Sequence, residues 1–566
     1  MLQRQVVMLW AVVLIALCSY SAAVRAQTIN HPSKSGQELA AILDYISADW
    51  SLLTRSTPTC QAAADPKLTD PAVLYLPADF AIPAGLPKLL QDCHVRVEHL
   101  PAVIRGPGQV TGNAIHPPGL LFLENPYVVP GGRFNEMYGW DSYFIIRGLL
   151  RANQIDLARG MVENFFFEIE HYGTVLNANR TYYLTRSQPP FLSSMIVAVY
   201  QAEQTQGRAD RAWLARAYKY GSQDYEMWTR SPHLAGDTGL SRFYDFGEGP
   251  VPEGLHDETG YYQDVLAYFL KRDKLSPYLV ESQSPDSLPN PDYSLQLCEQ
   301  KASPPGSKCD VIKYVALSPE YYKGDRSMRE SGFDISFRFG PYGAETHHYA
   351  PVCLNSLLYK TESDLEQIAT WLGDKQAAAE WHQRAQKRQS DIQTLLWNQQ
   401  RGLFFDYDFV AQKQSSYEYV TTFYPLWAGL ATPAQARSLV KNPPLFEQAG
   451  GLAMSTKETG VQWDYPYGWA PIQLLAVEGL RRHGYNAEAD RISYKFLSMV
   501  LANFGRDGNI REKYNVVTDS SNLKLSEGYR DNVVGFGWTN GVFLELLNTL
   551  PKELANRLST QPLPTN

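Results

Sequence analysis

Helical periodicity recurs along most of this chain, and this repetition limits the folds that the chain can adopt. Apolar residues return every three or four positions in five long segments, at 188–206, 208–230, 365–398, 468–485 and 487–504. Such spacing places the apolar side chains on one helix face, which must be buried against another element. Alternating strand patterns are few and short, as in GLFFDYDFV at 402–410. The sequence therefore predicts a mainly α fold.

Many helices of similar length, separated by long decorated loops, fit a toroid of helix pairs. Periodicity alone does not distinguish a toroid from a solenoid, and no fixed-period repeat is visible. We predict a main helical domain over 116–550 and a C-terminal tail over 551–566. Residues 27–115 are rich in Pro and Ala with weak periodicity, so we expect an N-terminal arm or cap packed on the toroid.

Residues 1–26 have the pattern of a secretory leader. Arg4 precedes an apolar run at 6–18 that is too short for a comfortable membrane span, and Val-Arg-Ala at 24–26 fits a cleavage site. We expect cleavage near Ala26, a periplasmic or secreted protein, and no membrane contact after cleavage. The alternative is an uncleaved amphipathic anchor.

The net charge limits the class of partner, and the cysteines limit the possible disulfides and metal sites. Cleavage would change the net charge from −8 to −10, and an acidic chain without basic runs argues against nucleic acid. In an oxidising compartment Cys60–Cys93 and Cys298–Cys309 are plausible local disulfides, and Cys353 is left as a buried free thiol. No CxxC motif or Cys/His spacing indicates zinc. We expect no metal, no cofactor and a monomer.

Four loop segments join aromatic residues to Arg, Asp, Asn or Gln, and they lie at 130–144, 177–191, 329–340 and 461–471. Sugar hydroxyls need polar partners, whereas sugar C–H faces pack on aromatic rings. Each segment alone would fit a structural corner. Their recurrence in four places favours a carbohydrate site.

Hydrolysis of a glycosidic bond generally needs two carboxyl groups. Asp334 is a candidate general acid, because Phe333, Phe337 and Phe339 could desolvate it and raise its pKa, and Glu330 is the rival. Glu512 is a candidate base, since flanking cations at 511 and 513 would favour its ionised form. On local sequence alone, Glu512 fits an ordinary surface ion pair better.

The segments PGGRFNEMYGWDSYF at 130–144 and QWDYPYGWAP at 462–471 resemble, almost letter for letter, the two signatures of trehalases of glycoside hydrolase family 37. NANRTYYLTRSQPPF, ESGFD, EKYN and GFGWTNG match further family segments in the same order. The resemblance covers roughly residues 115–550 and points to the periplasmic or secreted bacterial type. It implies an (α/α)6 toroid with long active-site loops, and hydrolysis of α,α-trehalose to two glucoses with inversion.

Carried over position by position, the resemblance implies Asp334 as general acid and Glu512 as general base, in place of the surface ion pair. The implied substrate-binding residues are Arg133, Trp140, Asp141, Asn177, Arg186, Ser187, Gln188, Glu253, Gly332, Trp463, Asp464 and Glu527.

The chain departs from the family pattern at several positions. Val251 replaces the arginine of an Arg-Pro-Glu block, so one cationic contact is missing or comes from elsewhere. Phe333 stands where Trp is common and Asn515 where Asp is common, and the lid segment with Glu527 is stretched by about two residues. The alternatives are therefore an inverting α-glucosidase for another disaccharide and a non-catalytic sugar-binding relative. Retention of both carboxylates argues against the second.

Overall fold

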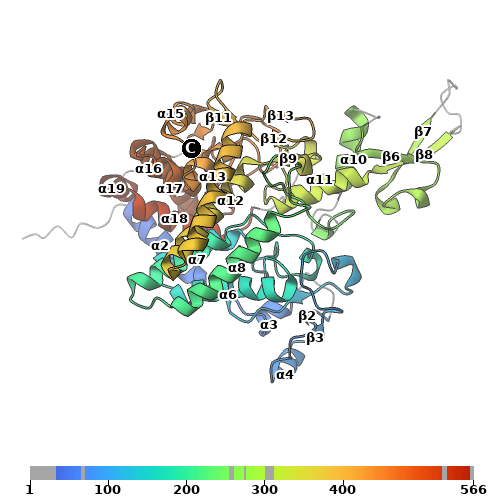
Figure 1. The fold of residues 1–566 in the computed structure, drawn as a ribbon, viewed down its shortest axis with the longest axis horizontal. Coiled ribbons are helices and arrows are strands. Elements are labelled where there is room, and N and C mark those ends of the chain that lie inside the picture. Colours follow the sequence, from blue (N-terminus) through green and yellow to red (C-terminus); the bar gives the residue numbers. More distant parts are fainter. Residues whose placement is uncertain are drawn as a thin grey trace, which may run out of the picture.

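The computed structural model describes residues 34–65, 71–253, 260–272, 276–299, 311–525 and 532–560. Helices dominate these residues, which confirms the mainly α prediction (Figure 1). The expected leader, Cys309 and Glu527 lie outside the described residues.

Six of the described helices form a closed inner ring. Each contacts the next in chain order, and the last contacts the first. They are α5 (Asp141–Arg151), α7 (Leu192–Thr205), α12 (Val352–Leu372), α14 (Tyr424–Ala428), α16 (Ala470–Arg482) and α18 (Gly537–Thr549). The ring closes where α5 meets α18, and glycine allows the close approach: a Cβ added at Gly148 would lie 2.5 Å from Cα of Gly541.

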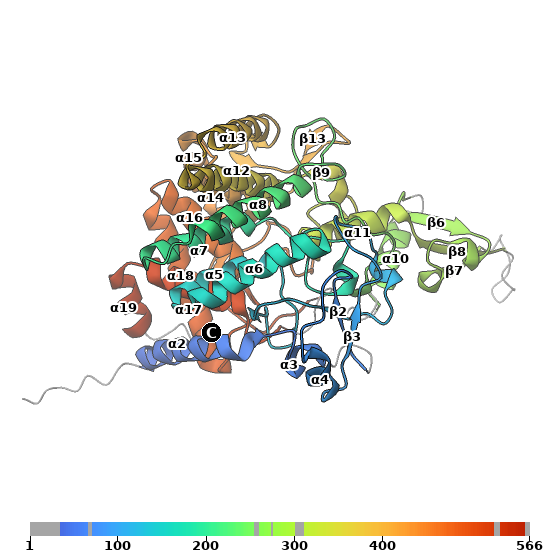
Figure 2. The same ribbon diagram turned by 60° about the horizontal axis from the view of Figure 1, so that its bottom comes forward.

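A second layer of helices surrounds this ring (Figure 2). The helices that pack outside it are α6 (Ile155–Tyr172), α8 (Arg211–Trp228), α13 (Lys375–Leu395), α15 (Pro433–Lys441) and α17 (Asn486–Asp507). From the N-terminal segment, α2 (Lys34–Leu53) packs against α17, α18 and α19 (Lys552–Thr560). The indole of Trp50 on α2 is fully buried beside Gly148. This cyclic arrangement of helix pairs is that of an (α/α)6 toroid and not of a solenoid.

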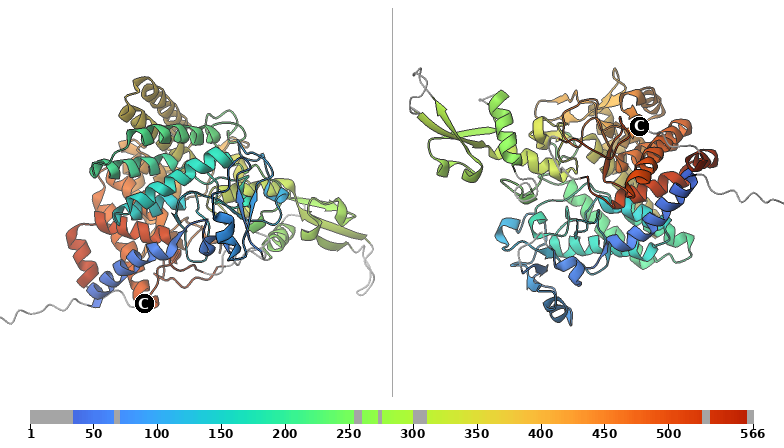
Figure 3. Two further views of the ribbon diagram at one scale, coloured as in Figure 1. Left: turned by 90° about the horizontal axis from the view of Figure 1, so that it is seen from below. Right: turned by 180° about the vertical axis from the view of Figure 1, so that it is seen from behind.

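Shorter elements decorate the toroid. A parallel sheet near the N-terminus has β2 (Val73–Leu76) between β3 (Arg96–His99) and β4 (Leu120–Leu121), beside α3 (Cys60–Ala63) and α4 (Leu86–Gln91). An antiparallel sheet projects from the side of the molecule between α10 (Tyr261–Arg272) and α11 (Pro319–Glu330) (Figure 3). Its strand order is β6 (Leu279–Ser282), β8 (Val311–Leu317) and β7 (Leu295–Glu299).

The remaining strands are very short. Eight of them form four antiparallel pairs: β1 (Thr54–Arg55) with β5 (Tyr127–Val128), β10 (Trp397–Asn398) with β11 (Leu403–Phe404), β14 (Glu447–Gln448) with β15 (Gly451–Leu452), and β16 (Tyr467–Trp469) with β17 (Lys513–Asn515). The other three form one antiparallel sheet in the order β13 (Lys413–Gln414), β12 (Tyr407–Asp408) and β9 (Tyr349–Ala350). The strand expected over 402–410 is thus two short strands, because the chain bends between Phe404 and Tyr407.

The cysteines follow the predicted pattern where the structure describes them. Cys60 and Cys93 form a disulfide with a Cα–Cα distance of 5.7 Å, and Cys353 is a buried free thiol on α12. Cys298 is also disulfide-bonded, but the predicted pairing with Cys309 stays a prediction. None of the described helices has an apolar stretch long enough to cross a bilayer.

Candidate active site

The predicted loop segments meet in one pocket at the end of the toroid where the inner helices begin. Trp140 precedes the first residue of α5, Trp469 precedes α16, and Trp538 lies in the first turn of α18. The residues lining this pocket are Pro130, Phe134, Tyr138, Trp140, Asp141, Asn177, Tyr183, Arg186, Gln188, Glu253, Arg329, Gly332, Asp334, Gln462, Trp463, Trp469, Glu512, Phe536 and Trp538. Both predicted catalytic carboxyl groups are thus in one cavity.

Asp334 follows the C-terminal end of α11 and is held from two sides. The side-chain amide of Gln462 donates to its backbone oxygen at 2.5 Å, and the guanidinium of Arg329 lies 3.9 Å from its Oδ2. The side chain remains 22% exposed, so it is accessible from the cavity.

The three phenylalanines near Asp334 do not surround it as expected. Phe333 packs against the pocket tryptophans Trp140 and Trp463, whereas the rings of Phe337 and Phe339 pack on tyrosines of the following loop. The chain turns after Asp334 and carries the later two rings elsewhere. Only Phe333 therefore belongs to the pocket wall.

Glu512 is buried, which excludes an ordinary surface ion pair. The Nζ of Lys513, itself fully buried, donates to Oε2 of Glu512 at 2.6 Å. The other flanking cation, Arg511, turns to Asp507 at 3.9 Å and donates to the backbone oxygen of Asn532. One of the two expected cations thus contacts Glu512 directly.

Asp141 is a third carboxyl group in the pocket. Burial raises its pKa well above the ordinary value, its own backbone N–H opposes this effect, and the nearby charges of Glu512 and Asp334 add to the increase. Asp141 therefore favours the neutral form, in which a carboxyl group donates a hydrogen bond. Asp141 thus shares the pocket with Asp334 and Glu512.

An ion pair forms the opposite wall. Arg186 donates to Glu253, and the two side chains are almost completely buried. Burial acts to raise the pKa of Glu253, but the positive charges of Arg186 and Arg329 outweigh this effect and leave the pKa below its ordinary value. The pair is therefore fully charged and presents fixed polar groups to the cavity.

Arg329 also explains how the site accommodates Val251. Val251 is buried in an apolar cluster, and its backbone N–H donates to the hydroxyl of Tyr262 at 2.8 Å. It brings no charge to the pocket. The guanidinium of Arg329 instead lies near both Glu253 and Asp334, so a cation reaches this wall from α11.

Four tryptophan side chains form another part of the wall. Trp463 stacks on Trp469 with ring centroids 3.8 Å apart, and Trp140 contacts both Trp463 and Trp538. Gly332 is required beside them: its φ is +74°, and an added Cβ would lie 3.0 Å from Cε2 of Trp140. These rings offer flat apolar surfaces to the faces of a sugar.

Of the predicted site residues that the structure describes, three do not line the pocket. The Ser187 hydroxyl donates to the backbone oxygen of Val175 at 2.6 Å. Asp464 is fully buried and accepts from the backbone N–H of Phe337 at 3.0 Å, so it fixes the loop after Asp334. Arg133 is exposed, and its guanidinium lies over the ring of the lining residue Phe134. Arg133 is therefore at the rim, and a role in binding stays a prediction.

Glu330, the rival acid, has a structural position. It is fully buried outside the pocket lining, accepts from the backbone N–H of Tyr244 at 2.6 Å and contacts Nε2 of His233 at 3.2 Å. Its neighbour Arg329 is the more important residue for the site and was not predicted. Sequence reasoning also missed Tyr138, Tyr183, Gln462, Trp469, Phe536 and Trp538, although each lies in a segment that signals the family.

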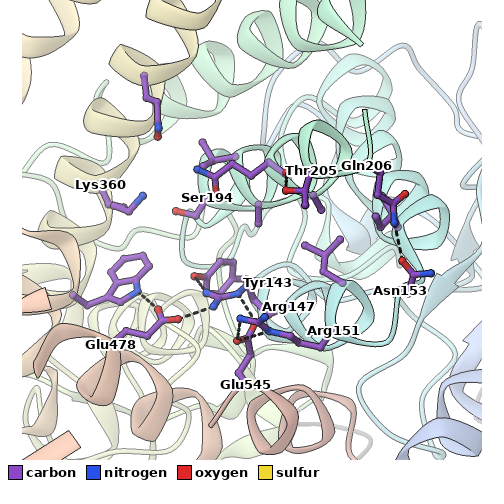
Figure 4. A pocket seen from close by; sticks show the side chains of 18 of the residues that line it. Tyr143, Arg147, Arg151, Asn153, Ser194, Thr205, Gln206, Lys360, Glu478 and Glu545 are labelled. Carbon is purple, nitrogen blue, oxygen red and sulfur yellow. Dashed lines mark hydrogen bonds and ion pairs between the residues drawn. The ribbon is translucent and has the colours of Figure 1, made fainter. Parts of the chain in front are cut away.

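A second cavity of about 590 Å³ lies at the other end of α5 (Figure 4). Arg147 spans its floor, 2.7 Å from Glu478 and 2.9 Å from Glu545. The charge of Arg147 outweighs the effect of burial and lowers the pKa of Glu478, so this carboxylate is not a proton donor at neutral pH. The cavity shares no lining residue with the pocket that holds Asp334 and Glu512.

Comparison with known proteins gives one consistent result. The family model described as Trehalase matches residues 90–551. The cytosolic neutral trehalase of Saccharomyces cerevisiae is 36% identical over 88% of this chain and 69% of its own length, and that of Emericella nidulans is 37% identical over 75% of this chain and 58% of its own length. This chain thus spans about three fifths to two thirds of the length of these relatives.

A solved structure supports the same relationship. The neutral trehalase Nth1 from Saccharomyces cerevisiae has a TM-score of 0.75 and 33% identity, covering 92% of this chain and 96% of that chain. These relatives overturn the expected location. They are named cytosolic neutral trehalases, which contradicts the prediction of a periplasmic or secreted protein of the bacterial type. An apolar N-terminal run is by itself a weak indicator of location, because it shows that a segment is hydrophobic and not in which compartment the protein works. The extent of the family match and the closed helical ring together show that the chain belongs to the trehalase family.

Proposed function

We propose that this chain hydrolyses α,α-trehalose to two glucose molecules, with Asp334 as general acid and Glu512 as general base. The observation that carries the proposal is the meeting of these two carboxyl groups, far apart in the chain, in one pocket walled by tryptophans and arginines. The family membership supports a glycoside hydrolase, and the names of the relatives support trehalose as the substrate.

The reaction needs one proton donated and one removed. Asp334 in its acid form donates a proton to the glycosidic oxygen, and the bond to the anomeric carbon breaks. Glu512 takes a proton from a water molecule, which attacks that carbon from the opposite face. The Nζ of Lys513 donates to the carboxylate of Glu512 and holds it in position. The expected products are one α-glucose and one β-glucose.

Substrate choice is the first test, because Val251 replaces a family arginine. We expect trehalose to be cleaved much faster than maltose, kojibiose or sucrose, since Arg329 brings a cation to the same wall. Glucose release by the purified full chain, measured as kcat/KM for each sugar, tests this expectation. Faster cleavage of maltose or kojibiose would assign the site to another α-glucosidase, the second candidate function.

Arg186 supplies the second test. Its guanidinium donates to Glu253 and lines the cavity, and a lysine at this position cannot copy its planar array of donors. Arg186→Lys should lower kcat/KM for trehalose on the order of 10²-fold or more. This is the loss expected when a buried charged contact to the transition state is removed.

Arg208→Lys is the matched control for that variant. Arg208 pairs with Asp156 at 3.0 Å on the surface, where both side chains are well exposed. The control should retain normal kcat/KM. Normal activity and folding of Arg186→Lys would show that Arg186 has only a structural role.

A further inference from the structure

Three side chains outside the active site direct metal-binding atoms toward one another. Glu320 lies in the first turn of α11, and His347 and His348 lie in the 3-10 helix η6 (Thr346–His348). The Nε2 atoms of the two histidines are 3.0 Å and 2.9 Å from the same Oε1 of Glu320. All three potential ligand atoms lie within 4.8 Å of one another.

These separations suit one small divalent ion. Bonds of 2.0–2.1 Å to imidazole nitrogen and carboxylate oxygen, arranged tetrahedrally, place neighbouring ligand atoms about 3.3 Å apart. Two imidazoles and one carboxylate are a ligand set of borderline transition metals, whereas Mg²⁺ and Ca²⁺ select oxygen ligands. We propose that Glu320, His347 and His348 bind a divalent transition metal of the Zn²⁺ class, with water completing its coordination.

An ion can reach this position from solvent. The side chains of Glu320 and His348 are 45% and 26% exposed, while that of His347 is 7% exposed and anchors the site.

The surrounding charges are mixed. The carboxylates of Glu320 and Glu345 both lie near the hydroxyl of Tyr278, which donates to Glu345 at 3.1 Å. Arg242 is a neighbouring cation, but its guanidinium donates to the backbone oxygen of His347 at 2.9 Å and not to the imidazole. A divalent ion would therefore be attracted by two carboxylates and opposed by one arginine.

The position of the ligands gives a bound ion a structural role. Glu320 lies in the first turn of α11, which ends beside Arg329. The chain then passes Asp334 before it returns to His347 and His348. An ion would cross-link the two ends of this segment. The expected effect is greater stability of the folded chain, because a ligand that binds only the folded state stabilises it in proportion to the logarithm of its concentration. This inference does not depend on the proposed function.

The test uses the full chain without a polyhistidine tag, stripped with a chelator and then titrated with ZnCl₂. We expect saturable binding of one equivalent by calorimetry and a rise in the thermal unfolding midpoint. Co²⁺ should bind in the same place and give visible d–d absorption typical of four or five ligands. Mg²⁺ and Ca²⁺ should change neither quantity.

Variants locate the ion. His348→Gln and Glu320→Gln alter partly exposed side chains, so both should fold, and each should weaken Zn²⁺ binding by at least about 10²-fold, given that even outer-shell changes cost 10–100-fold. His382→Gln is the matched control, because His382 lies 3.3 Å from a single carboxylate, that of Glu366. This variant should bind Zn²⁺ as tightly as the wild type does. Absence of saturable binding to the wild type would overturn the proposal, as would unchanged binding by both variants.

Discussion

Glu512→Gln and Asp334→Asn are each expected to lower kcat for trehalose by at least roughly 10²–10⁴-fold, the usual contribution of a positioned acid or base. Each amide keeps the shape of the side chain but cannot transfer the proton. Both residues line the same pocket, and the amides keep its shape. Binding of the substrate should therefore remain largely intact. Steady-state kinetics gives kcat, and binding of trehalose to the inactive variants by calorimetry gives affinity.

Product stereochemistry completes this test. Proton NMR of the wild-type reaction, recorded before mutarotation, should show α- and β-glucose in equal amounts. Inversion further predicts that the carboxyl groups of Asp334 and Glu512 are about 6.5–9.5 Å apart, which leaves room for water. Glu380→Gln, which changes an exposed carboxylate on α13, should be fully active. Two α-glucoses would exclude inversion, and a fully active Glu512→Gln would make Asp141 the next carboxylate to test.

Arg338→Met is expected to destabilise the folded chain by about 3–5 kcal/mol, the cost of breaking a buried ion pair from one side. Arg338 is fully buried and donates to both carboxylate oxygens of Asp406, at 2.7 Å and 2.6 Å. The variant leaves Asp406 charged without its partner. Thermal unfolding of the variant and wild type, followed by circular dichroism, measures the loss.

A second substitution separates charge from packing. Asp406 also accepts the first backbone N–H of α12, from Val352, at 2.8 Å. Arg338→Met with Asp406→Asn keeps an acceptor for that N–H but removes the stranded charge, so it should recover part of the lost stability. Arg230→Met is the control, because Arg230 pairs with Glu226 on the surface, where such pairs contribute about 0–1 kcal/mol. Equal destabilisation by Arg338→Met and Arg230→Met would contradict the prediction.

The helical fold could be predicted because periodicity is a local property of sequence. The position of Asp334, Glu512 and Trp140 in one pocket could be predicted because they lie in segments nearly identical to those of a known family. Periodicity could not show that α2 from the N-terminal segment packs beside α17 and α18, since that contact joins distant parts of the chain.

Two carboxyl groups show the limit of sequence reasoning at this site. Asp464 and Glu330 have the same chemistry as Asp334 and Glu512, but their carboxylates bond to backbone N–H groups that only the fold brings near. Arg329 was missed because its direction at the end of α11 decides its role. The adjacent histidines at 347 and 348 lack the spacing of structural zinc motifs. Their common partner Glu320 lies at the other end of the segment, in the first turn of α11, more than two helical turns before that helix ends.

The junction of α5 with α18 has a consequence for how the chain is made. The two faces of that seam leave the ribosome at widely separated times, because α5 ends at residue 151 and α18 begins only at residue 537. Contacts between such distant segments form slowly, since a large loop must close before they gain any stabilising energy. Until the last helices emerge, the apolar faces of the first ones have no partner, and nascent chains of this kind are prone to aggregation.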